Sequence, residues 1–115
     1  MTAAAIIEQA LLNGVMLSTD GQNIKLAASR QPSAELLDSL ASSKQQVIGE
    51  LERLQRQWLE RVAHTLHRPP EWLLQHGIID ADDMRELWHT EPREAAKTAK
   101  TGLNWHLARS DYESE

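Results

Sequence analysis

Hydrophobic and polar positions divide the first half of the chain into a short apolar helix, a hairpin and two further helices. Residues 3–12 are apolar over most of a helical surface, and Thr2 is a suitable N-cap for them. The pair Asn13-Gly14 follows, and such a pair is typical of a left-handed helix end. The pattern therefore predicts a helix over residues 3–12.

Two strand-like runs come next, at residues 15–19 and 23–28, and Asp20-Gly21 joins them. An Asp-Gly pair between alternating runs is the strongest short-range signal for a β-hairpin. A two-stranded hairpin alone is marginal in water, so we expect helices to cover one of its faces. The outer edge of the second strand then keeps unpaired backbone groups, to which another chain can add a strand. The alternation places these side chains on the covered face: Val15, Leu17, Thr19, Ile24, Leu26 and Ala28.

Two more helices complete the first half. Ser33 is placed to cap the first of them, and Glu35 lies in its first turn, where a carboxylate suits the helix dipole. The second begins near Ser43 and ends before Pro69-Pro70. Gly49 in its interior lowers helix stability relative to alanine, which indicates a close contact or a break at that point. Its apolar residues recur at helical spacing: Val47, Leu51, Leu54, Trp58, Val62 and Leu66.

The second half is predicted to be helical. Pro70 suits the first position of a helix that His76-Gly77 ends. Asp80 caps the next helix, over residues 81–88, and Thr90 caps a last helix that runs to about residue 100. The fold class is therefore α+β and mostly helical.

Three parts are expected along the chain. Residues 1–54 form an αββαα module with a small β-hairpin, and residues 55–109 form a helical extension continuous with the third helix. Residues 110–115 form a disordered acidic tail.

Composition narrows the class of protein. The 115 residues fit one compact domain, or one small module with a helical extension. The absence of cysteine excludes a disulfide framework and cysteine-based metal sites, and it fits a reducing cytoplasm. No secretory leader or membrane-spanning apolar run is recognisable, so we expect a cytoplasmic protein. The net charge of −5 makes nucleic acid an unfavourable partner.

Patterns that would indicate chemistry are weak. Glu60, His64 and His67 lie on neighbouring faces of one helix, but the spacing of a zinc protease pair and a third ligand are missing. The aspartates of residues 80–83 lack the central glycine of a calcium loop, and helix capping accounts for them. No nucleophile motif or glycine-rich phosphate loop is visible. We therefore expect a non-enzymatic protein without metal or other cofactor.

The stretches ALLNGVMLSTDGQNIKLAA and PSAELLDSLASSKQQVIGEL carry a family resemblance. Their order of helix, Gly-Val strand, Asp-Gly turn, alternating strand, proline and lysine-bearing helix resembles the TubC-type N-terminal docking domain. That αββαα module is found at the start of subunits of nonribosomal peptide and hybrid polyketide synthetases. The resemblance implies recognition of a short partner peptide, often acidic, against the exposed second strand. It covers about residues 3–54, with the anchors Gly14, Val15, Asp20, Gly21, Leu26, Leu36 and Lys44.

The continuation into a helical extension, where the family has a synthetase domain, favours a freestanding adaptor. Trp105 is a candidate aromatic anchor in the final segment, although packing on its own chain is an equal alternative. The hairpin edge and the long helix also offer self-complementary surface, so we expect partial dimerisation. The residues expected to bind a partner are Ile24, Lys25, Leu26, Arg30, Lys44 and Trp105.

A second class of function stays open. A small, acidic, cysteine-free chain without catalytic motifs also fits a regulatory or anti-defence protein of a mobile element, which inhibits a larger complex by surface binding. A helix-turn-helix DNA binder built from residues 70–89 is disfavoured, because Asp82, Asp83 and Glu86 would face phosphates.

Overall fold

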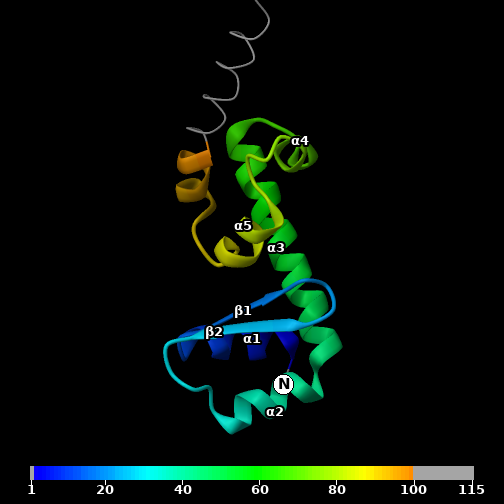
Figure 1. Ribbon diagram of the computed structural model, residues 1–115, viewed down its shortest axis with the longest axis vertical. Helices are drawn as coiled ribbons and strands as arrows, with labels where there is room; N and C mark the ends of the chain where they lie inside the picture. The colour runs from blue at the N-terminus through cyan, green and yellow to red at the C-terminus, as the bar shows by residue number, and fades with distance from the viewer. Residues whose placement is uncertain (1, 100–115) are drawn as a thin grey trace, which may run out of the picture. The chain divides into compact units, whose positions relative to one another are not determined.

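The fold is α+β and mostly helical, as the sequence predicts, with one antiparallel hairpin in the part of the chain that is described (Figure 1). The structure is a computed structural model and describes residues 2–99. The chain divides into two compact units, residues 1–54 and residues 55–115, and a single helix, α3, contributes to both. Trp105 and the expected acidic tail, residues 110–115, lie outside the described residues.

The first unit begins with helix α1, Ala3–Leu12. The hydroxyl oxygen of Thr2 caps it by accepting a hydrogen bond from the backbone N–H of Ala5 at 3.1 Å. Asn13 ends the helix, and Gly14 follows at φ +74°, a conformation that costs glycine little. These local signals place both ends of α1 as predicted.

The hairpin consists of strands β1, Val15–Thr19, and β2, Ile24–Ala28, in antiparallel register with Leu17 opposite Leu26. α1 packs against β1 (Figure 1). The β1 side chains alternate between buried and half-buried positions, as predicted. The expectation that the apolar face of β2 is also covered is wrong. Ile24 is half-buried, Leu26 keeps 40% of its surface exposed and Ala28 is exposed. The covering helix therefore buries one strand of the pair and leaves the other open.

Two helices complete the first unit. Helix α2, Ala34–Ser42, is capped by the hydroxyl of Ser33, which accepts from the N–H of Leu36 at 3.2 Å. Helix α3, Lys44–Leu66, starts and ends where the apolar stripe predicts. Gly49 does not interrupt α3, and a side-chain carbon added at this position would meet no atom within 4 Å, so the expected close contact is absent there. The core of this unit consists of Ile6, Ile7, Ala10, Val15, Leu17, Leu36, Leu40, Val47, Ile48 and Leu51.

The second unit packs short helices with the C-terminal part of α3. Helix α4, Pro70–Gln75, has proline in its first turn, and Gly77 follows it at φ +68°. Helix α5, Ala81–Leu87, begins with a reciprocal capping box between Asp80 and Asp83. The buried apolar residues of this unit are Trp58, Leu59, Val62, Ala63, Leu73, Ile79, Trp88, Ala96 and Ala99.

Residues 92–99 are helical, as expected, but Thr90 does not cap this helix. Its hydroxyl donates to the carbonyl of Leu87 at 2.6 Å, which closes the preceding turn. The carbonyl of Glu91 instead accepts from the N–H groups of Glu94 and Ala95. The helix thus starts one residue later than an N-cap at Thr90 implies, because the threonine hydroxyl already bonds to the backbone before it.

Candidate functional site

The open side of β2 is the candidate site in the first unit. β2 is paired with β1 alone in the described sheet, so its outer backbone edge faces no second strand there. All its residues except Ile24 are exposed. An edge strand of this kind presents unpaired N–H and C=O groups at the spacing that an added strand requires.

The turn that precedes β2 is held by side-chain hydrogen bonds. The Asp20 carboxylate accepts from the N–H groups of Asn23 and Gln22, each at 2.9 Å, and these bonds hold its pKa below the ordinary value of 3.8. The Thr19 side chain is 2% exposed, and its hydroxyl donates to the carbonyl of Asn23 at 2.7 Å and accepts from Gly21. Gly21 adopts φ +95°, which a larger residue tolerates poorly. The turn therefore fixes where β2 begins.

The basic residues expected at the site lie towards different ends of β2. The Nζ of Lys44, the first residue of α3, donates to the Oδ1 of Asn23 at 3.4 Å, which brings this cation to the turn end of β2. Lys25 lies near the same end, since its charge contributes to the lowered pKa of Asp20. Arg30 follows the opposite end of the strand. At about 3.3 Å per residue, the five residues of β2 separate these ends by roughly 15 Å.

Exposed apolar side chains also concentrate in this unit. In the described chain, Leu11, Leu12, Leu26 and Leu37 of the first unit are exposed, and Leu12 keeps 80% of its surface accessible. The second unit exposes Leu74 alone among its large apolar residues in this range. Accessible apolar surface in the first unit is therefore not confined to Ile24 and Leu26, the two apolar residues predicted to support a partner.

Sequence reasoning missed two residues that shape this site. Asp20 was expected to form a tight turn, but its role in anchoring Gln22 and Asn23 was not foreseen. Asn23 holds Lys44 through its side-chain oxygen, and it lies 21 positions away in the sequence. The tendency of aspartate to bond the backbone two residues ahead could have indicated the first role, whereas nothing local indicates the second.

Neither a metal-binding cluster nor a membrane-spanning helix accompanies this edge in the described chain. Within residues 2–99, no group of three or more His, Cys, Asp or Glu side chains is placed to hold a metal ion. No helix in that range combines the length and the apolar character that crossing a membrane requires. Comparison with protein-family models, curated proteins and solved structures finds no match.

Proposed function

We propose that residues 1–54 form a protein docking module of the TubC type, which captures a short acidic segment of another protein as an added strand on β2. The observation that carries this proposal is the open edge of β2, with its exposed side chains next to a turn fixed by hydrogen bonds. The module acts without catalysis or a cofactor, in the cytoplasm, as part of a freestanding adaptor.

In this proposal, backbone groups and side chains of the site have different roles. Backbone hydrogen bonds to an added strand supply affinity but carry no preference for sequence. Ile24 and Leu26 contact the partner strand from the apolar side, while Lys25, Arg30 and Lys44 select carboxylates. Because the cations stand towards both ends of β2, the favoured segment carries acidic residues towards both of its ends.

The test starts with the full chain and a displayed library of random peptides. Selected peptides are synthesised and titrated into the isotopically labelled protein, and amide signals are followed by NMR. We expect enrichment of acidic sequences, shifts at residues 24–28, and slower hydrogen exchange of β2 amides when the peptide is bound.

The double reversal Lys25→Glu with Arg30→Glu should weaken this binding about tenfold and reduce its salt dependence, because rim charges act mainly through association rate. The double reversal Arg61→Glu with Arg93→Glu changes the net charge by the same amount in the second unit, and it should leave the signals of β2 responsive. Selected peptides that shift the second unit and leave β2 unchanged would contradict the proposal.

A further inference from the structure

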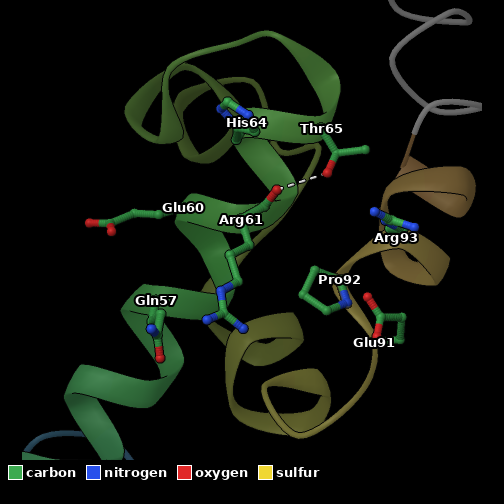
Figure 2. A pocket seen from close by; sticks show the side chains of 8 residues that line it. All are labelled: Gln57, Glu60, Arg61, His64, Thr65, Glu91, Pro92 and Arg93. Atoms are coloured by element: carbon green, nitrogen blue, oxygen red, sulfur yellow. Dashed lines mark hydrogen bonds between the residues drawn. The ribbon is translucent and has the colours of Figure 1, made fainter.

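The second unit has a groove of its own, between the C-terminal part of α3 and the turn that opens the helical residues 92–99 (Figure 2). Its volume is about 470 Å³, within the range of sites that hold small ligands or short peptide segments. The groove is lined by Gln57, Glu60, Arg61, His64, Thr65, Glu91, Pro92 and Arg93.

The arginines of this unit separate into two groups. Arg56 bonds to Glu71 at 2.5 Å and to Glu60 at 3.3 Å, and Arg85 bonds to Asp82 at 2.8 Å. The Arg68 guanidinium lies over the Trp72 ring, 4.9 Å from its centroid. Within residues 2–99 these cations thus have partners inside the unit.

Arg61 and Arg93 have no ion pair or side-chain hydrogen bond within residues 2–99. Both are exposed, and both line the same groove from different elements (Figure 2). They are 32 positions apart in the sequence, so the fold alone brings them together. Two guanidinium groups without partners that line one groove from two elements can form a site for anions.

The carboxylates of the groove do not cancel these charges equally. Glu60 extends away from the turn of residues 91–93 in Figure 2 and is bonded to Arg56. Glu91 is the other carboxylate in the lining. The lining therefore holds two arginines without partners and one carboxylate that is not bonded to Arg56, while Gln57 and His64 add side chains able to donate hydrogen bonds.

We infer that this groove binds a short acidic peptide segment, at a site separate from the β2 edge. The planar guanidinium group matches a carboxylate with two parallel hydrogen bonds, and two such groups suit a segment with two nearby carboxylates. A nucleic-acid backbone is a poorer fit, because it carries a phosphate at every nucleotide and needs a broader basic surface than two arginines on a chain of net charge −5 provide.

The experiment uses the full chain and a blocked hexaglutamate peptide at low ionic strength. The side-chain Nε–H signals of Arg61, Arg93 and Arg85 are followed by NMR, with hexaglutamine as the uncharged probe. We expect hexaglutamate to shift the signals of Arg61 and Arg93 together and to leave Arg85, which is engaged by Asp82, unchanged. Hexaglutamine should shift none of them.

The double variant Arg61→Gln with Arg93→Gln should weaken the binding read at His64 and Gln57 by about tenfold, equivalent to about 1.4 kcal/mol. Its far-ultraviolet circular dichroism should match that of the parent chain, since both side chains are exposed. The Lys25→Glu with Arg30→Glu variant should bind at this groove as the parent does. If no peptide binds at the β2 edge, the binding of hexaglutamate at this groove is therefore still expected.

Three outcomes would overturn the inference. The first is an absence of shifts at Arg61 and Arg93, and the second is an equal response to hexaglutamine. The third is tighter binding of a thymidine hexanucleotide than of hexaglutamate, which would assign the groove to nucleic acid instead.

Discussion

Gly49 lies on the exposed side of α3, where an added side-chain carbon would meet open space. Glycine in a helix interior is less favourable than alanine, because it loses more backbone freedom on folding. We predict that Gly49→Ala raises the free energy of unfolding by about 0.5–1 kcal/mol. Urea unfolding followed by circular dichroism measures the change.

Gly14 provides the matched control, since an added side-chain carbon also meets open space there but the backbone has φ +74°. Gly14→Ala should lower the free energy of unfolding by about 1 kcal/mol, because alanine resists the left-handed conformation. If Gly49→Ala lowered stability as well, α3 would need flexibility at this position.

The ionisation of Asp20 makes the stability of the turn before β2 depend on pH. Its pKa is lowered by hydrogen bonds from the backbone of Asn23 and Gln22, so the folded state favours the ionised carboxylate. The associated stability is present above the ordinary pKa of 3.8 and is lost as the pH falls through the lower folded value. We predict that Asp20→Asn flattens this acid-side decline relative to the parent chain, measured by urea unfolding between neutral and strongly acidic pH. Parallel declines in the two proteins would contradict this assignment.

The two strands of the hairpin contribute unequally to stability. Leu17 is fully buried on β1, whereas Leu26, its partner across the pair, keeps 40% of its surface exposed on β2. We predict that Leu17→Ala lowers the free energy of unfolding by about 2–5 kcal/mol. Leu26→Ala should cost less than about 1 kcal/mol, because less apolar surface returns to water.

Urea unfolding of both alanine variants tests this asymmetry. The Leu26→Ala variant should also bind the peptides selected on β2 more weakly than the parent does. Equal losses of stability from the two substitutions would mean that β2 is covered in solution, and the docking edge would then be closed.

Element boundaries follow from the sequence where the signal is local. Thr2, Ser33 and Asp80 cap the helices as their positions predict, and Gly77 ends α4. The uncovered face of β2 could not be predicted, because alternation shows which side chains share a face and not which strand a helix covers. Thr90 does not form the expected N-cap, because its hydroxyl donates to the carbonyl of Leu87 instead.

The groove that Arg61 and Arg93 line could not be predicted from the sequence. The two arginines share no helical or strand period, since they stand on different elements and are 32 positions apart. Arg61 belongs to a slightly basic stretch of α3, but whether a cation has a partner depends on which carboxylates the fold brings near it. Local pattern does not contain that information.

At the scale of the whole molecule, self-association is expected through the hairpin. The apolar stripe of α3 was expected to offer surface to a second copy, but Trp58 and Val62 on this stripe are buried within the second unit. The edge of β2 remains as surface that can pair with itself across a twofold axis. We predict that light scattering at micromolar concentration gives a mass above the 13.0 kDa of one chain.

A peptide selected on β2 should return the mass to that of one chain, because it competes for the same edge. A constant monomer mass over a wide dilution range would count against the dimer. A dimer that persists in saturating peptide would place the contact elsewhere on the molecule.

The hairpin and α1 are joined by contacts that are local in the sequence, which has a consequence for how quickly this part of the first unit forms. β1 pairs with β2, and α1 packs on β1, so these contacts join elements that follow one another directly along the chain. Such contacts need little loop closure, and chains rich in them fold rapidly. The interval in which newly made strands are unpaired, and open to aggregation, is correspondingly short.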